Sequence, residues 1–487
     1  PPTSIAPLPP GAAYSANAQT VSVGTPYSMA VPSMATSLLP HGGGLANPDI
    51  IAPTPPTYTP AVLPVPGSYP VAQAGNYPPA ARGAYPYAAM SPVQRELDQI
   101  RQERSAEARM GTELRSRNGA DGTSKLNEVQ VPLQILFPAG DGKIDVRMTP
   151  VSLDAGSLSN DPYALATFGG GAPAYAADPS RPEIKSATGV GFSAGYKTEN
   201  VELDLGVSPV GFQETNFVGG LLLKGTLDEA GTVNYRVDFS RRPVTESLLS
   251  YAGMKDERTG QQWGGVTATG VRATVGKDFG DAGIYGDAAW HSLQGNEVAS
   301  NRRMEFNTGA YFRVIDEVDS KLTAGVNLNA TFFDENLSFF TYGHGGYFSP
   351  QHSYSLSVPV SWAQRADRMT YRIDGSVGLQ HFKQDDAPMF PNNPELQALA
   401  RSDIPGISDG FYPGQTKTGV SYNVRASAEY RLGPQWAVGA VLGADNASDY
   451  RQWAGGLYLR YYFQPQTREL DVPHEPHRSP YGNTYGR

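Results

Sequence analysis

The sequence predicts an all-β protein: a transmembrane antiparallel β-barrel of about sixteen strands, preceded by a short helix and a Pro-rich disordered segment. Three observations lead to this prediction. Apolar and polar residues alternate with a period of two from residue 108 onward, short connections between segments alternate with longer ones, and the chain has no long apolar run. A membrane-spanning helix needs about 18 consecutive apolar residues. The stretch from Ala437 to Ala444 is among the longest apolar runs in this chain. Any membrane-spanning segments must therefore be strands in which apolar and polar residues alternate.

Apolar and polar side chains alternate over many stretches of the chain. Val233, Tyr235, Val237 and Phe239, for example, alternate with Asn, Arg and Asp. Strict alternation over roughly ten residues, with aromatics near the ends, is typical of outer-membrane strands. The pattern predicts sixteen strands, at 108–117, 124–137, 142–151, 187–198, 200–208, 215–225, 231–240, 264–276, 282–293, 302–314, 319–333, 351–363, 367–380, 416–430, 434–446 and 450–463.

The connections between these segments support a barrel of the bacterial type. Short turns follow the even-numbered segments, whereas every long connection follows an odd-numbered one: 152–186, 241–263, 334–350 and 381–415. Bacterial barrels have short periplasmic turns and long outer loops. An even number of strands then places both ends of the barrel, 108–463, on the periplasmic side.

Soluble β-proteins also alternate, so two of them are alternatives. A single β-sandwich would need far fewer strands. A propeller would repeat a recognisable motif every ~40–50 residues, and no such motif recurs here. The membrane barrel is therefore the preferred interpretation.

The regions outside the barrel differ from it in composition. Segment 1–90 has 19 Pro but only two charged residues, Asp49 and Arg82, which predicts a disordered, extended tether. Segment 91–107 is rich in helix-forming residues and predicts one periplasmic helix, possibly the end of a helical repeat array. Segment 464–487 predicts a periplasmic or lumenal tail that either hangs free or folds back to border or partly block the pore.

Composition excludes several classes of function. The chain has 487 residues, no Cys, and a formal net charge of −9, which argues against thiolate metal sites, cysteine nucleophiles and a broad nucleic-acid interface. Its first residue is Pro1, with no apolar signal core, which suggests part of a larger precursor.

Motifs for catalysis, metals or cofactors are weak. Asp385–Asp386 and Asp256–Glu257 are adjacent carboxylates in predicted loops, whereas a glycosidase needs two carboxyls held across a cleft. His474, Glu475 and His477 resemble a metal site, but their Pro-rich setting predicts a solvated tail instead. We therefore expect no enzyme activity, no metal and no cofactor.

The face opposite the apolar one must line the lumen of the predicted barrel. Paired charges there would hold a wet interior open, and interleaved tyrosines could contact sugar rings, although each tyrosine could equally be a filler of the lumen. Together they favour a hydrated, neutral, hydroxyl-rich cargo. The candidates for its path are Tyr285, Tyr311, Tyr458, Tyr462, Asp287, Glu305, Arg372, Asp374, Arg425, Glu429 and Arg460. The same face carries Glu128, Asp145, Arg147, Glu202, Asp204, Arg236, Asp238 and Arg313.

Three stretches of the chain resemble a known family. These are Arg115 to Leu126 (RSRNGADGTSKL), Phe339 to Trp362 with its Tyr-Phe-Ser-Pro segment, and the closing Leu457 to Phe463 (LYLRYYF). They are similar to the barrel of the outer-membrane subunit of bacterial cellulose synthase (cellulose synthase operon protein C) over about 108–463. The resemblance implies periplasmic tetratricopeptide repeats followed by a sixteen-stranded exporting barrel.

The resemblance also implies partners and a mechanism. A cellulose chain (β-1,4-glucan), made and pushed by the inner-membrane synthase, would cross the outer membrane passively, with outer-membrane lipid around the barrel. Loops 152–186 and 381–415 could gate the outer mouth, or could be ordinary solvated loops. The alternatives are a plugged structural anchor that docks periplasmic synthase components, and a general porin.

Overall fold

The structure is a computed structural model that describes Ser91, Val93, Ile100 and residues 105–183, 186–402, 409–447, 450–466 and 469–482. The predicted tether 1–90 lies outside the described residues, as does most of the predicted helix 91–107. The first strand, β1, begins at Glu107, the residue at which that helix was expected to end.

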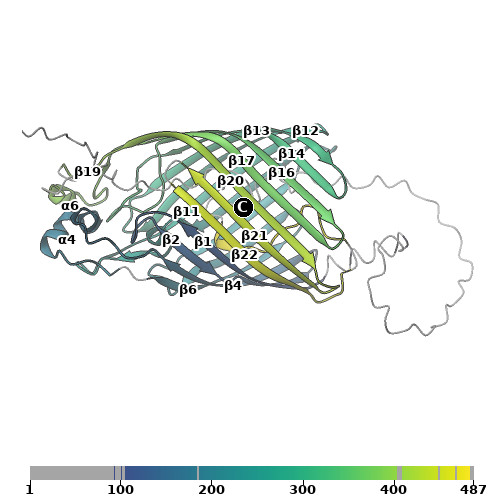
Figure 1. Cartoon of the computed structure of the whole chain (residues 1–487), viewed down its shortest axis with the longest axis horizontal. Helices are drawn as coiled ribbons and strands as arrows, with labels where there is room; N and C mark the ends of the chain where they lie inside the picture. The colour runs from purple at the N-terminus through teal and green to yellow at the C-terminus, as the bar shows by residue number, and fades with distance from the viewer. Residues whose placement is uncertain are drawn as a thin grey trace, which may run out of the picture.

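Sixteen antiparallel strands form one closed barrel, which confirms the predicted fold and strand number. Figure 1 shows the strands inclined to the long axis of the barrel. They are β1 (Glu107–Arg117), β2 (Leu126–Gln130) continued by β3 (Leu133–Ala139), β4 (Gly142–Asp154), β6 (Ala187–Lys197), β7 (Val201–Val210), β8 (Phe217–Thr226), β9 (Val233–Pro243), β11 (Gln262–Asp278), β12 (Ala282–Asn296), β13 (Asn301–Asp316), β14 (Ser320–Phe333), β16 (His352–Ala366), β17 (Met369–Gln384), β20 (Gln415–Arg431), β21 (Trp436–Ala447) and β22 (Tyr450–Tyr462).

The barrel closes where the first strand pairs with the last. β1 runs antiparallel to β22 from Glu107 opposite Tyr462 to Arg117 opposite Gln452. Pro132 interrupts the second strand because it has no N–H to donate. Its carbonyl still accepts from the Gly111 amide at 3.0 Å, and the Val131 amide donates to the Pro150 carbonyl at 2.9 Å. The ladder on both sides of the interruption is thereby kept.

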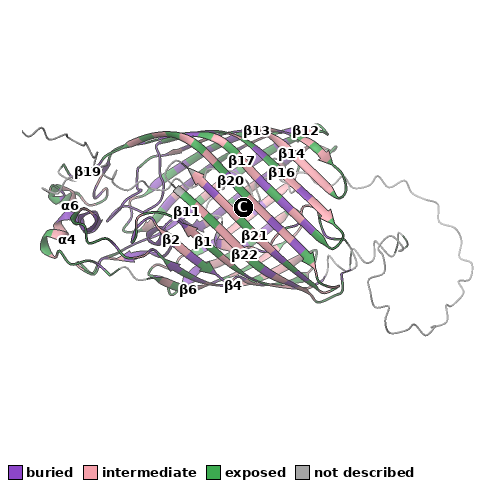
Figure 2. Cartoon of the chain, in the orientation of Figure 1, coloured by how far each residue is buried: buried purple, intermediate pink, exposed green. Residues whose placement is uncertain are grey.

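The two faces of the wall differ in polarity as the alternation predicts. On β13, Arg303 and Glu305 face the lumen and are buried, whereas Phe306 faces outward and is 52% exposed. Figure 2 shows exposed and less exposed residues alternating along the strands. An apolar outer face and a polar lumen are what a membrane-spanning barrel requires. Among the described residues, no helix has both the length and the apolar character needed to cross a membrane.

The two ends of the barrel are also unlike. One end, the turn end, has short turns only. At the other end the four long connections carry α3 (Pro162–Ala166), α4 (Gly171–Ala177), α5 (Leu248–Ala252), α6 (Pro394–Leu399) and the short strands β5 (Phe168–Gly169), β10 (Met254–Lys255), β15 (Phe340–Thr341), β18 (Ala387–Pro388) and β19 (Phe411–Tyr412). α4, α6 and β19 lie together at this end in Figure 1. We call this assembly of loops the cap.

The cap has its own core, so its long loops pack together and are not separate solvated segments. Trp263 is fully buried between the rings of Phe168, at 5.4 Å between centroids, and Tyr342, at 5.0 Å. Arg258 forms a buried ion pair with Asp256 at 2.9 Å and donates to the carbonyls of Leu165 and Phe168. Because these residues come from three of the four long connections, the core ties the loops to one another.

Candidate functional site

All the predicted path residues face the lumen, and the structure brings most of them together in three polar groups. The first group surrounds Arg460 on β22, near the turn end. Its guanidinium lies 3.0 Å from the carboxylate of Glu107 and 3.4 Å from that of Glu429. It also donates to the Tyr462 hydroxyl at 3.2 Å, and the Tyr458 hydroxyl donates to Glu429 at 2.9 Å. Arg109 on β1 also pairs with Glu107, so two cations and two anions from β1, β20 and β22 neutralise one another on the wall.

The second group spans β11, β12 and β13. Arg272 bridges two carboxylates, Asp287 at 2.6 Å and Glu305 at 2.8 Å, and Arg303 also pairs with Glu305. The Asn307 amide donates to Asp287 at 2.9 Å. With two cations and two anions, the group presents hydrogen-bonding atoms without a net charge.

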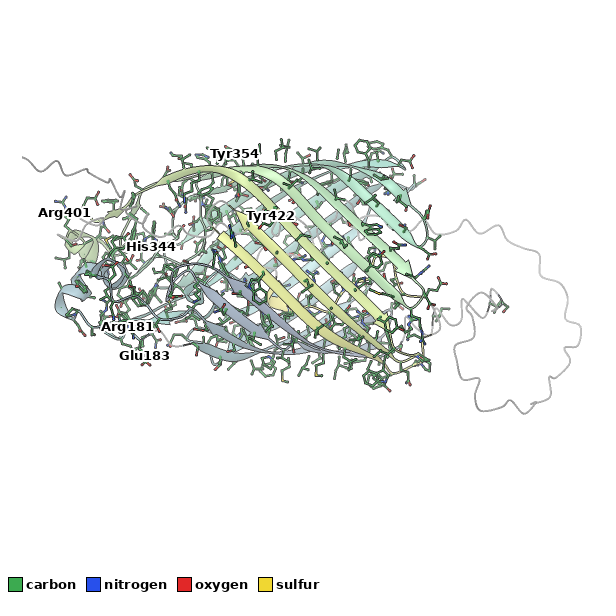
Figure 3. All side chains as sticks on the ribbon, viewed as in Figure 1. Arg181, Glu183, His344, Tyr354, Arg401 and Tyr422 are labelled. Carbon is green, nitrogen blue, oxygen red and sulfur yellow. The ribbon has the colours of Figure 1, made fainter. Side chains whose placement is uncertain are left out.

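The third group lies on β16, β17 and β20. Asp374 accepts from Arg372 at 2.9 Å and from the Ser361 hydroxyl at 2.6 Å. Arg425 stands directly opposite Asp374 in the strand register. On the opposite face of the wall, side chains such as those of Tyr354 and Tyr422 are exposed (Figure 3).

The lumenal tyrosines lie on the wall over glycines of the neighbouring strand. Tyr458 is paired across the sheet with Gly439, Tyr311 with Gly283, and Tyr285 with Gly309. A Cβ at any of these three glycines would overlap the tyrosine ring. An aromatic ring that covers a cross-strand glycine restores packing that the glycine lacks. These tyrosines are therefore structural parts of the wall, whether or not they also contact cargo.

Two of these rings are covered by other side chains on the side that faces the lumen. The Arg313 guanidinium lies 5.4 Å from the centroid of the Tyr311 ring. The imidazole of His477, from the C-terminal tail, lies 6.3 Å from the Tyr458 ring. A sugar ring could stack on Tyr458 only after His477 had moved.

The described tail, residues 464–466 and 469–482, runs inside the barrel from the turn end to the cap. Near the turn end, the Leu470 carbonyl accepts from Arg365 at 2.8 Å. Farther along, the Glu475 carbonyl accepts from Arg460 at 2.8 Å, and His477 Nε2 donates to the Pro132 carbonyl at 3.1 Å. The Ser479 amide donates to Glu113 at 2.6 Å. His474 and His477 are 4% and 3% exposed, so the prediction of a solvated tail was wrong for them.

Sequence reasoning missed several lumenal residues. Arg272 and Asn307 lie within predicted strands and on their inward register, so stricter use of the period-two pattern would have found them. Asn327 is a similar case, since its amide donates to the Tyr285 hydroxyl at 2.6 Å. A tail that folds back to the pore was one of the two predictions, but because the tail has no periodicity, no sequence signal pointed to the residues that it contacts. Among the described residues, no cluster of three or more His, Asp or Glu side chains could hold a metal ion.

The glycine under Tyr458 gives a test of the wall packing. We expect Gly439→Ala to lower the free energy of unfolding by about 1–3 kcal/mol, because the new methyl group overpacks against a ring held by Glu429. Gly443→Ala is the matched control on the same strand and face, since its nearest atom would be 3.7 Å away. Urea unfolding in lipid vesicles measures the stability of both variants. Equal stabilities would contradict the packing of Tyr458 over Gly439.

The tail histidines predict a pH dependence. Burial lowers the pKa of both His474 and His477 to about 4, helped by Arg460, Arg372 and Arg478 around His474 and by Arg109, Arg147 and Arg460 around His477. A released tail would titrate near ~6.5. Insertion is therefore fully favourable above that pH and weakens as pH falls toward 4; at about pH 5 it is already weaker by about 2 kcal/mol per histidine.

A ¹⁹F label on a cysteine that replaces Gly482 reports where the tail tip lies. We expect its lumenal resonance to give way to that of a released tail between about pH 6.5 and pH 4. The variant with both His474→Gln and His477→Gln should lose this transition. A transition that persists in the double variant would assign it to other groups.

Comparisons with known proteins identify relatives of this chain. The family described as "Cellulose synthase operon protein C C-terminus" matches residues 124–464. Cellulose synthase operon protein C of Pseudomonas fluorescens (strain SBW25) is 40% identical over 394 residues, which cover 81% of this chain and 30% of that protein. The protein of that name from Escherichia coli (strain K12) is 30% identical over 375 residues, or 74% of this chain and 31% of that protein. The chain thus spans less than a third of the length of these relatives.

Solved structures of barrels are similar at low sequence identity. One titled "Bacterial polysaccharide outer membrane secretin" matches with a TM-score of 0.45 and 12% identity, over 74% of this chain and 99% of that chain. Pseudomonas putida OprB matches with a TM-score of 0.34 and 12% identity, over 76% and 96%. The family match over 124–464 and the identity to the curated relatives show that this chain belongs to the cellulose synthase operon protein C family.

Proposed function

We propose that the barrel is a bacterial outer-membrane channel that exports a polysaccharide, cellulose (β-1,4-glucan), passively through its lumen. The observation that carries the proposal is a closed barrel whose polar lumen is lined by ion-paired side chains and tyrosines, in a chain of the cellulose synthase operon protein C family. The apolar outer face of the barrel supports a membrane location.

The proposed orientation follows from the two ends of the barrel. β1 starts and β22 finishes at the turn end, and short turns are periplasmic in bacterial barrels. Both termini of the barrel would then be periplasmic, and the cap would face the outside. Residues 1–90 would reach toward an inner-membrane cellulose synthase complex.

The lumenal groups suit a neutral polymer better than an ion. The groups around Arg460 and Arg272 bind their charges internally, so little net field remains to attract an ionic cargo. The hydrogen-bonding atoms that these groups present to the lumen could exchange one sugar hydroxyl for the next as a chain passes. Because no energy source acts at the outer membrane, such weak and distributed contacts would let a pushed chain slide.

The cap would act as the gate at the outer mouth. It is joined to the barrel wall by Arg115, which donates to the Thr245 carbonyl at 2.7 Å, and by Arg117, which donates to the Glu246 carbonyl at 2.6 Å. Its loops share one core, so opening would move them together.

A second function, a plugged structural anchor, has one observation in its favour. The tail lies inside the lumen, with contacts from Arg365 near the turn end to Val207 near the cap, so it occupies part of the proposed path. An anchor would keep this arrangement permanently, whereas a channel must clear it.

The channel function is tested by single-channel conductance in a planar bilayer. Cellohexaose or maltohexaose is added on the side of the turn end. In channels that are open, we expect cellohexaose but not maltohexaose to block the current. Tyr458→Ala should weaken that block about fivefold, because an aromatic contact contributes about 1 kcal/mol. Tyr430→Ala, which removes an outward-facing tyrosine from β20, is the control and should leave the block unchanged. Indifference to both sugars would indicate a general porin.

The gate is tested by Tyr412→Ala. Tyr412 is fully buried in the cap and stacks on Phe339 with 3.8 Å between centroids. Removing a buried aromatic costs about 3–5 kcal/mol of local stability, so we expect a higher open probability while the barrel stays folded on gels. Phe411→Ala, at the exposed neighbouring position, should leave conductance as it was. A Tyr412→Ala barrel that never conducts would support the plugged anchor.

A further inference from the structure

The tip of the tail is part of the core of the cap. Tyr481 is 4% exposed and belongs to the same cluster of buried side chains as Trp263. Its ring lies 6.0 Å from that of Tyr251 in α5, and its hydroxyl donates to the Val207 carbonyl at 2.9 Å. One residue of the tail therefore completes the packing of loops at the far end of the barrel.

The wall is shaped to receive this tip. Gly191 on β6 lies under the Tyr481 side chain, and a Cβ at that position would overlap the phenol. Tyr251 itself contacts Phe212 at 5.2 Å between centroids, edge to face. The tip thus fits between a bare stretch of the wall and an aromatic pair of the cap.

The rest of the tail occupies groups that the cargo is proposed to contact. The Glu475 carbonyl accepts a hydrogen bond from Arg460, and the His477 ring lies against Tyr458. A glucan that enters at the turn end meets these contacts before it reaches the cap. Tail and cargo therefore compete for the same atoms.

The tail can leave without damage to the sheet. Pro473, Pro476 and Pro480 have no N–H, so the tail cannot pair as a regular strand. Isolated hydrogen bonds hold it to the wall, such as that from Thr370 to the Asp471 carbonyl at 3.1 Å. Contacts of this kind can be replaced one at a time by sugar hydroxyls, whereas a ladder would break cooperatively.

We propose that Tyr481 and the tail behind it couple the two ends of the channel: cargo that enters at the turn end displaces the tail, and this withdraws Tyr481 from the cap core and opens the cap. Tyr481 is then a positioning residue for the gate. The proposal rests on the export function proposed above. It explains how a cap at one end responds to a polymer at the other without an energy source.

Cap opening is measured directly by the labelling of a buried cap residue. The chain has no Cys, so Ala252→Cys, which places a thiol at a fully buried position of α5, gives a single reporter. An impermeant thiol reagent is applied from the cap side of barrels in lipid vesicles. We expect cellohexaose at the turn end to raise the labelling rate, and Tyr481→Ala to raise it about tenfold without sugar, because loss of a buried aromatic favours local opening. Tyr481→Phe, which keeps the ring, should have a smaller effect.

A locked tail separates coupling from simple plugging. Ser479 and Gln130 are hydrogen-bonded side chain to side chain, so Ser479→Cys with Gln130→Cys can be joined by a short reducible thiol cross-linker before the reporter is labelled. We expect cellohexaose to leave reporter labelling unchanged while the link is intact, and reduction to restore the response. Each single cysteine variant, treated in the same way, is the control. An exposed reporter, Glu395→Cys, should label at one rate throughout.

The outcomes distinguish this proposal from the export function. If the locked tail still allows sugar-induced labelling of Ala252→Cys, or if Tyr481→Ala leaves labelling at the wild-type rate, the coupling is wrong while export stands. If Tyr412→Ala neither conducts nor exports, the export function itself fails. Barrel folding is verified for every variant by its mobility on gels before and after heating.

Discussion

The pairing of β1 with β22 is the interaction on which the rest of the structure depends. In a bilayer, every backbone N–H and C=O must be satisfied internally, and only a closed sheet has no free edge. Eleven residue pairs, from Glu107–Tyr462 to Arg117–Gln452, make that closure. Once the sheet closes, one face of each strand must meet lipid and the other must meet the lumen. The sorting of apolar from polar residues follows from this one constraint.

A closed barrel encloses a polar lumen, which has to be filled by side chains or closed off from free passage of solutes. Charges on the inner face neutralise one another across strands, as Arg272 does between Asp287 and Glu305. Tyrosines cover the glycines that permit close approach of neighbouring strands, as Tyr458 covers Gly439. The tail lies inside the lumen, and the cap lies at one end of the barrel. In the proposed channel, the same polar groups that stabilise the empty wall would be the ones that the passing chain contacts.

Wall and gate differ in how they are held, and this difference suits their proposed roles. The wall is a continuous ladder whose loss is cooperative. The cap core and the tail are held by side-chain packing and by isolated hydrogen bonds, for example from Tyr481 to Val207. Elements that move in proteins are usually those of lower local stability. A rigid barrel with a separately packed gate can therefore change its opening without change in the sheet.

The sequence by itself determined the barrel. Period-two alternation and the order of short and long connections predicted sixteen strands, with boundaries within a few residues of those observed, because lipid on one side and a polar lumen on the other constrain every second residue. The lumenal position of Tyr285, Asp287 and Arg460 followed from the same period. Only the tertiary structure decided which charges pair, that the tyrosines lie over glycines, and that Tyr481 joins the cap. Those contacts join residues far apart in the chain without any period, and local sequence carries no signal for them.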